Sequence, residues 1–206
     1  MIADVAEGKR DLRRRLRAAR AARDDQDLVG GQLLACAVRA GLLDPDGQPG
    51  RVGPVRIAAY VATAGEPDVS AIRKAVLTAG GTVLLPIPQA QRQLAWAPDE
   101  GAYVTAGALR VPMPVGIPVG LGPECLADWG IGLVLAPALA VDATGTRLGQ
   151  GGGFYDALLA ALPPGIAIVA VVHDEEVLDP GAIPRDAHDT PIIRALTPSG
   201  LLRLAR

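Results

Sequence analysis

The chain has 206 residues, with 20 lysines and arginines against 22 aspartates and glutamates and a formal net charge of −2. This length suits a single α/β domain whose core needs no disulfide or metal support. The two cysteines, Cys36 and Cys125, are far apart, so neither a disulfide framework nor a zinc site is indicated. No apolar run reaches membrane-spanning length and the charged N-terminus lacks a signal-peptide pattern, so we expect a cytoplasmic protein without a membrane partner.

The N-terminal segment is basic and has helical periodicity. Leu12, Leu16 and Ala19 recur between arginines at helical spacing, and a second apolar set including Leu33 and Ala37 predicts another helix after it. A basic helix suits either nucleic acid or a small anionic ligand. Aromatic residues make up only 3% of the chain and the overall balance is acidic, so we expect no nucleic-acid partner.

The middle of the chain alternates between strand and helix patterns. Residues 55–63 are apolar and predict a buried strand, and Asp68 or Ser70 can cap a following helix. That helix ends at Gly80 and Gly81, and residues 82–85 begin the next strand. This order predicts a β-α-β unit with parallel strands.

The second half continues the alternation after a proline-rich interval. Frequent prolines in residues 94–122 predict short edge strands and loops. Residues 131–136 and 166–172 predict buried strands, with a helix at 154–162 between them. The expected fold is therefore a single α/β domain with a mostly parallel sheet flanked by helices and a basic N-terminal helix. Ligands of such sheets bind beyond the carboxyl ends of the strands, so we expect chemistry in the loop after residues 131–136.

That loop, residues 145–156, reads GTRLGQGGGFYD. Its glycines allow backbone N–H groups to approach an anion, and the helix that follows adds its positive end. Arg147 offers a planar donor fork for phosphate, and Asp156 offers a carboxylate for Mg²⁺. The loop matches neither the P-loop nor the dinucleotide fingerprint, so by composition alone a flexible turn is an equal alternative.

The segment GTRLGQGGGFYD closely resembles the signature of 5-formyltetrahydrofolate cyclo-ligases, also called methenyltetrahydrofolate synthetases. Three other stretches are similar to that family: KRDLR at 9–13, YVATAGEPDV at 60–69, and the C-terminal stretch with Ile183, Pro184, Asp189 and LTP at 196–198. The resemblance implies a Rossmann-like sheet and an ATP-dependent, Mg²⁺-dependent closure of 5-formyltetrahydrofolate to 5,10-methenyltetrahydrofolate. It implies a small-molecule folate partner, and we expect a monomer.

The resemblance also implies roles for particular residues. Lys9 and Arg147 would be catalytic, Val61 and Glu66 would bind the folate, and Asp156 and Asp189 would bind Mg²⁺. ATP would be bound by two segments, which comprise Lys9, Arg10, Asp11, Leu12 and Arg13 and then Arg147, Leu148, Gly149, Gln150, Gly151, Gly152, Gly153, Phe154 and Tyr155.

Simpler interpretations remain beside these roles. Lys9 could be a solvated surface charge, Glu66 could serve only helix entry, and Phe154 could anchor the loop in the core. His173 and His188 have no partner residues nearby in sequence and are expected to be ordinary histidines. Two rival functions are another ATP- or phosphate-ester-binding α/β enzyme, and a degenerate family member or nucleic-acid regulator without catalysis.

Overall fold

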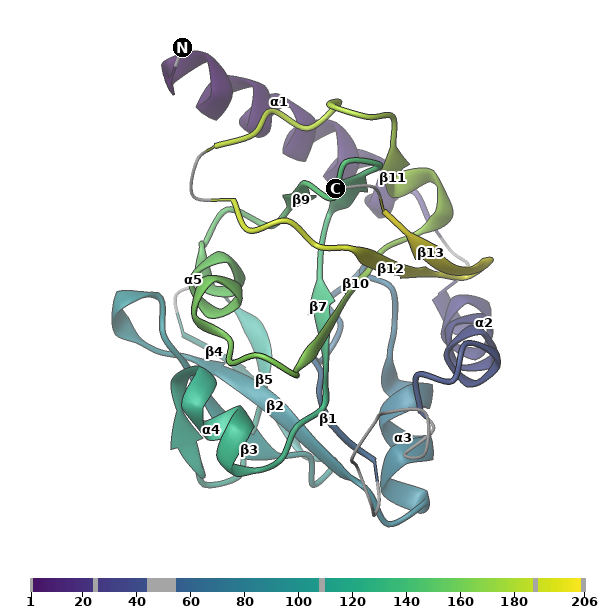
Figure 1. The fold of residues 1–206 in the computed structure, drawn as a ribbon, viewed down its shortest axis with the longest axis vertical. Helices are drawn as coiled ribbons and strands as arrows, with labels where there is room; N and C mark the ends of the chain where they lie inside the picture. Colours follow the sequence, from purple (N-terminus) through teal and green to yellow (C-terminus); the bar gives the residue numbers. More distant parts are fainter. Residues whose placement is uncertain (1, 24–25, 44–54, 108–109, 187–188, 205–206) are drawn as a thin grey trace.

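The structure is a computed structural model that describes residues 2–23, 26–43, 55–107, 110–186 and 189–204. Its largest sheet has eight strands in the order β13-β12-β10-β7-β1-β2-β3-β6. The strands from β12 to β2 pair in parallel, while β13, β3 and β6 add antiparallel edges. The expected mostly parallel α/β fold is confirmed (Figure 1).

The predicted β-α-β unit is present, with a shorter first strand. It consists of β1 (Arg56–Ala58), α3 (Ser70–Thr78) and β2 (Thr82–Pro88). Residues 55–63 are not one strand, because after the N–H of Ala59 bonds to the carbonyl of Leu84 the chain leaves the ladder. It then turns at Thr63, whose carbonyl accepts from the N–H of Glu66. Asp68 accepts from the Ser70 N–H just before α3.

The proline-rich interval forms short strands, as predicted. Its elements are the 3-10 helix η1 (Ala90–Arg92), β3 (Leu94–Pro98), β4 (Tyr103–Ala106), β5 (Val111–Pro114) and β6 (Gly120–Leu121). β2 and β3 form an antiparallel hairpin in the main sheet, and β4 and β5 form a separate two-stranded ribbon. The short α4 (Gly122–Asp128) follows.

The second half supplies the centre and the other edge of the sheet. Its helix is α5 (Phe154–Ala161), and its main-sheet strands are β7 (Leu133–Pro137), β10 (Ala167–Val171), β12 (Arg194–Thr197) and β13 (Gly200–Arg203). A small sheet above the carboxyl end of β7 contains β8 (Ala140–Asp142), β9 (Arg147–Leu148) and β11 (Val177–Leu178), with the 3-10 helix η2 (Asp174–Glu176) before β11.

Alternating residues of the strands face two separate apolar layers. Ile57 and Leu133 pack with α2 (Gln26–Arg39) and α3 on one face, whereas Ala58 and Val134 pack with α4 and α5 on the other. Figure 1 shows these helix pairs on opposite sides of the sheet. Because both faces are covered, the central strands are apolar throughout. Both cysteines are free and buried in these layers.

The basic N-terminal helix, α1 (Ile2–Ala21), is the other predicted element that positions the site. Leu12 packs with Leu139, Leu148 and Ile183, so one face of α1 covers the small sheet at the carboxyl ends of the strands. In Figure 1 this helix crosses the top of the molecule beside β9 and β11. No helix in the described ranges is both long and apolar enough to cross a membrane.

Candidate functional site

A cavity of about 430 Å³ opens at the carboxyl ends of the central strands. This is the place expected for a ligand of a parallel sheet, and the volume suits a small organic molecule. The glycine loop forms one side, the segment that follows β1 forms another, and the two hairpins close the rest. Its lining residues are Arg17, Tyr60, Val61, Thr63, Glu66, Pro86, Pro88, Leu94, Arg110, Val111, Pro112, Pro137, Arg147, Gly149, Gln150, Gly151, Gly152, Gly153, Phe154, Tyr155 and Asp156.

The glycine loop adopts a backbone that only glycine tolerates well. Gly151 and Gly153 have φ angles of +103° and +73°, and Gly153 directly precedes α5. A Cβ on Gly149 would lie 2.8 Å from Nη1 of Arg147. The glycines therefore allow both the sharp turn into the helix and the close packing of the loop on an arginine.

Arg147 is held rigidly at the edge of the cavity. Its side chain is only 4% exposed, Nη1 donates to the carbonyl of Pro137 at 3.0 Å, and Nη2 bonds to Asp156. Its guanidinium lies 5.9 Å from the centre of the Tyr155 ring. The Nε atom has no hydrogen-bond partner within the described residues. These contacts hold the guanidinium of Arg147 in one orientation against the loop.

The basic face of α1 runs along the outside of this loop. Lys9 forms an ion pair with Asp189 at 2.6 Å, and Arg13 Nε donates to the carbonyl of Gly149 at 2.9 Å. One turn further, Arg17 donates to the carbonyl and the side-chain oxygen of Gln150 at 2.8 and 3.0 Å. Successive turns of one helix therefore bond Arg13 and Arg17 to the glycine loop, whereas Lys9 bonds to Asp189. Of these residues only Arg17 lines the cavity.

The pKa of Arg13 shows how concentrated the charge is here. Burial lowers this pKa most, and the nearby charges of Arg17 and Arg147 lower it further. The carboxylates of Asp156 and Asp189 oppose that shift. Two arginines and two carboxylates thus surround Arg13, so the charges at this end of α1 are closely paired.

Other residues of the two predicted ATP segments lie elsewhere. Arg10 is exposed, and Asp11 pairs with Arg14 on the outer surface of α1. Leu12 and Leu148 are buried together under the helix. These four side chains hold α1 in place or face solvent, and none of them lines the cavity.

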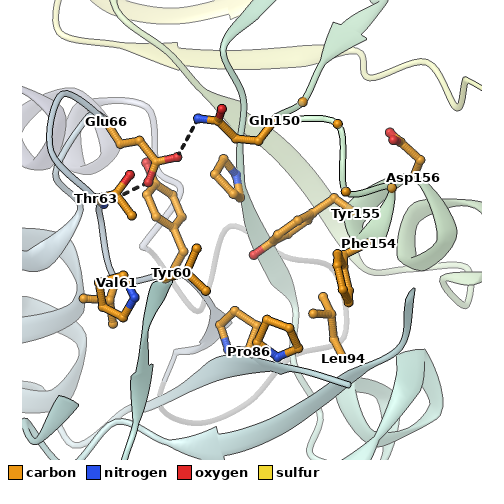
Figure 2. Close-up of a pocket in the computed structure, with 18 of the residues that line it drawn as sticks. Tyr60, Val61, Thr63, Glu66, Pro86, Leu94, Gln150, Phe154, Tyr155 and Asp156 are labelled. Atoms are coloured by element: carbon orange, nitrogen blue, oxygen red, sulfur yellow. Dashed lines mark hydrogen bonds between the residues drawn. The ribbon is translucent and has the colours of Figure 1, made fainter. Parts of the chain in front are cut away.

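Glu66 lies across the cavity from the glycine loop and is hydrogen-bonded to it. Its carboxylate accepts from the N–H of Thr63 at 2.9 Å and from the side-chain amide of Gln150 at 3.3 Å (Figure 2). Glu66 is 8% exposed. The structure therefore brings together Glu66 and the loop, which are distant in sequence, around a single cavity.

The Glu66 turn rests on a buried ion pair beneath it. Arg20 binds Glu176 through two hydrogen bonds of 2.7 and 2.8 Å and packs against Gly65, whose φ is +79°. A Cβ on Gly65 would lie 2.9 Å from Cβ of Arg20. A glycine before Glu66 thus lets the turn sit directly on the end of α1.

Several cavity residues were not predicted from the sequence. Val61 lies in the wall as expected, but Tyr60, Pro86 and Leu94 also contribute to it (Figure 2). Phe154 packs against the core layer of α4 and α5, as expected for a loop anchor, and it also lines the cavity. The prolines of residues 94–122 indicated short edge strands and loops rather than a binding surface, and Pro86 lies outside that interval.

The two predicted metal ligands are both engaged with cations. Asp156 is 39% exposed and uses Oδ1 for Arg147, whereas Asp189 uses Oδ2 for both Lys9 and the N–H of Asp186. No group of three acidic, histidine or cysteine residues gathers anywhere in the described part of the chain. A metal held only by protein is not supported, but Mg²⁺ commonly binds one or two carboxylates together with substrate phosphates, and Asp156 fits that mode.

His173 is a structural residue in this fold. It is fully buried, its Nε2 lies 3.1 Å from the carbonyl of Gly65, and burial lowers its pKa. Its backbone N–H donates to Glu176 at 2.9 Å. The histidine therefore supports the Glu66 turn from below and does not line the cavity. His188 lies outside the described residues.

Comparisons with known proteins identify the family of this chain. A family model described as the 5-formyltetrahydrofolate cyclo-ligase family matches residues 5–198. A 5-formyltetrahydrofolate cyclo-ligase of Mycolicibacterium smegmatis is 35% identical over 149 residues, which cover 69% of this chain and 73% of that protein. A mitochondrial 5-formyltetrahydrofolate cyclo-ligase of Arabidopsis thaliana is 36% identical over 84 residues, which cover 37% of this chain and 30% of that protein.

Two solved structures share the fold. The 5,10-methenyltetrahydrofolate synthetase of Aquifex aeolicus has a TM-score of 0.69 and 24% identity, covering 96% of this chain and 93% of that one. The synthetase of Mycoplasma pneumoniae has a TM-score of 0.66 and 16% identity, covering 91% of this chain and 97% of that one. At these identities the likeness concerns the fold.

Proposed function

Because the chain belongs to the 5-formyltetrahydrofolate cyclo-ligase family, we propose that it closes 5-formyltetrahydrofolate to 5,10-methenyltetrahydrofolate and converts ATP to ADP and phosphate. One observation supports this most strongly: Glu66 and the glycine loop face a single cavity and are linked through Gln150. An acidic group for a pterin and a cationic loop for phosphate are what this two-substrate reaction requires.

The chemistry needs alignment more than a protein nucleophile. The oxygen of an N-formyl group is a poor leaving group, so the reaction must first convert it to a phosphate. The formyl oxygen attacks the γ-phosphorus of ATP, and the neighbouring anilino nitrogen then attacks the formyl carbon and expels phosphate. The protein contributes orientation of the two substrates and neutralisation of the transferring group.

The phosphate side of the proposed site is the loop with its cations. The N–H groups of the glycine loop and the fork of Arg147 would bind the phosphoryl group in transfer. Arg13, which bonds to the carbonyl of Gly149, and Lys9, one turn earlier on α1, would neutralise the remaining phosphate charge. Because Lys9 is paired with Asp189, ATP would compete with that carboxylate for the ammonium group.

Asp156 would hold Mg²⁺ together with the phosphates, since one of its oxygens is free of Arg147 and the side chain is 39% exposed. Bound there, the metal would neutralise phosphate oxygens during transfer. A metal role for Asp189 would use Oδ1, because Lys9 and the N–H of Asp186 both occupy Oδ2.

The folate side is the segment after β1. Glu66 would accept hydrogen bonds from the N–H groups of the pterin, and Val61 would pack against the ring system. The wall of Pro86, Pro88 and Leu94 offers an apolar surface for the rest of the molecule. We further propose that the protein acts as a cytoplasmic monomer.

An absorbance assay for the methenyl product tests the proposal. The chromophore should form only when ATP, Mg²⁺ and 5-formyltetrahydrofolate are all present, and leaving out any one should abolish it. ATP turnover without folate would instead support another kind of phosphotransfer enzyme, and no turnover at all would support a non-catalytic family member.

A further inference from the structure

The chain contains three tyrosines, and their hydroxyl groups differ in whether they have a hydrogen-bond partner among the described residues. The hydroxyl of Tyr60 donates to the carbonyl of Pro67 at 2.6 Å. The hydroxyl of Tyr103 donates to Asp99 at 2.6 Å and accepts from Arg73 at 2.8 Å. The hydroxyl of Tyr155 is buried and has no hydrogen-bond partner among the residues that the structure describes.

The unpartnered hydroxyl points into the cavity. Tyr155 is the second residue of α5, and its ring projects from the helix toward Tyr60 with the hydroxyl leading (Figure 2). The cavity wall includes Pro86 and Leu94, which have no polar side-chain atom to offer. A buried hydroxyl without a hydrogen-bond partner lowers the stability of the fold by about 1–3 kcal/mol, so a tyrosine at this position calls for a functional explanation.

Two sets of groups flank Tyr155 along the cavity. On one side its ring faces Arg147 and the glycine loop, and on the other side of the cavity lie Glu66 and Thr63. In the proposed function the first set binds phosphate and the second binds the pterin. The atom that must lie between them is the oxygen that moves from folate to phosphate.

We infer that the hydroxyl of Tyr155 donates a hydrogen bond to the formyl oxygen of the bound folate and thereby orients it toward the phosphate. This inference rests on the proposed function. The sequence resemblance assigns Tyr155 to ATP binding. In this inference the loop backbone binds the phosphates of ATP, and the hydroxyl of Tyr155 binds the folate.

Three matched variants test this inference: Tyr155→Phe, Tyr60→Phe and Tyr103→Phe. Calorimetric titration of each with 5-formyltetrahydrofolate, without ATP, measures the affinity in question. Tyr155→Phe should bind about threefold to tenfold more weakly, since one neutral hydrogen bond is lost. Tyr103→Phe, which lies outside the cavity, should bind as wild type does, and the affinity of Tyr155→Phe for ATP should be unchanged.

Thermal unfolding without ligand gives a second readout that a purely structural role would not reproduce. Tyr60→Phe and Tyr103→Phe should melt at lower temperatures than wild type, because each loses a bond inside the protein. Tyr155→Phe should melt at the same or a higher temperature, because it removes an unpaired buried hydroxyl. A lower melting temperature for Tyr155→Phe would mean that its hydroxyl has a protein partner, and would overturn the inference.

The outcomes also separate this inference from the proposed function. If wild type binds and cyclises the folate while Tyr155→Phe has equal folate affinity, only the role of the hydroxyl is wrong. A loss confined to ATP affinity would equally contradict it. If wild type neither binds nor cyclises the folate, the proposed function itself fails, and the role of Tyr155 fails with it.

Discussion

The guanidinium of Arg147 bonds to the carboxylate of Asp156, and so joins the two ends of the glycine loop. Arg147 is 4% exposed and Asp156 is 39% exposed, so the arginine is fixed and the carboxylate remains accessible at the rim. A carboxylate at the rim can reach a metal ion from solvent while the buried guanidinium beside it keeps a partner for its positive charge. This relationship explains how Mg²⁺ and phosphate could be bound at one point of the loop.

The first prediction concerns the substitution Asp156→Asn. It removes an anionic oxygen with little change in volume, so the variant should fold normally but lose at least about tenfold in turnover at limiting Mg²⁺. The measurement is kcat as a function of Mg²⁺ concentration. The control Asp128→Asn alters an exposed residue at the end of α4 and should match wild type. An unchanged Mg²⁺ dependence in Asp156→Asn would remove Asp156 from the metal site.

The second prediction concerns the contact between Gly149 and Arg147. In Gly149→Ala the new Cβ would lie 2.8 Å from Nη1, and the guanidinium must move away. Misplacement of a phosphate-binding group should lower kcat/KM for ATP about a hundredfold. The melting temperature should fall as well, because the buried guanidinium would be pushed from its bonds to Pro137 and Asp156. Steady-state kinetics and thermal melts measure the two effects.

The control for this substitution is Gly31→Ala, inside α2, where a Cβ meets nothing within 4 Å. It should stabilise the fold by about 0.5–1 kcal/mol, as alanine does in helices, and leave kinetics unchanged. Equal ATP kinetics in Gly149→Ala and wild type would show that the position of Arg147 is not critical.

The third prediction separates folate recognition from nucleotide recognition. Glu66→Gln keeps an oxygen for the N–H of Thr63 but removes the negative charge that would face the pterin. A lost charged hydrogen bond costs about 1.5–3 kcal/mol, so kcat/KM for 5-formyltetrahydrofolate should fall about tenfold to a hundredfold while KM for ATP stays close to wild type. Glu124→Gln, on the exposed side of α4, is the matched control. A defect confined to ATP would place Glu66 outside the folate site.

The fourth prediction is a pH dependence of stability. Burial lowers the pKa of His173 below its ordinary value of 6.5. The unfolded chain therefore takes up the proton on His173 first as pH falls. The contribution of neutral His173 to the free energy of unfolding is complete above about pH 6.5 and is lost below it. The slope from this group should reach at most about 1.4 kcal/mol per pH unit.

Thermal melts of wild type and His173→Gln across this range measure that contribution. The glutamine amide can still donate to the carbonyl of Gly65 but cannot titrate, so its profile should be flatter than that of wild type. Two parallel profiles would mean that other groups produce the pH dependence.

Local patterns were sufficient to predict the fold and one side of the site. The glycines of the loop and the alternation of strands with helices are short-range signals. The sheet confirms the alternation, and the loop lines the cavity, while its binding of phosphate stays a prediction. The prediction of one strand over 55–63 was wrong, because the chain leaves the ladder after Ala59 although Tyr60 is still buried and residues 61–63 are half-buried. Composition alone does not distinguish a buried strand from buried irregular chain.

The remaining features depend on contacts between distant residues. Lys9 and Asp189 were predicted to serve phosphate and metal separately, but they form one ion pair across 180 positions. Arg17 and Tyr60 reach the cavity only because α1 and the end of β1 meet the glycine loop. No local pattern marks such residues, since the close approach of these segments is decided by the packing of the whole sheet.

The most direct test of the account is the stoichiometry of the complete reaction. Purified protein with ATP, Mg²⁺ and 5-formyltetrahydrofolate should release one phosphate for each methenyl group formed, with neither product appearing when folate or ATP is omitted. Phosphate release that does not depend on folate, or the absence of methenyl product while both substrates bind, would contradict the coupling of ring closure to ATP in this cavity.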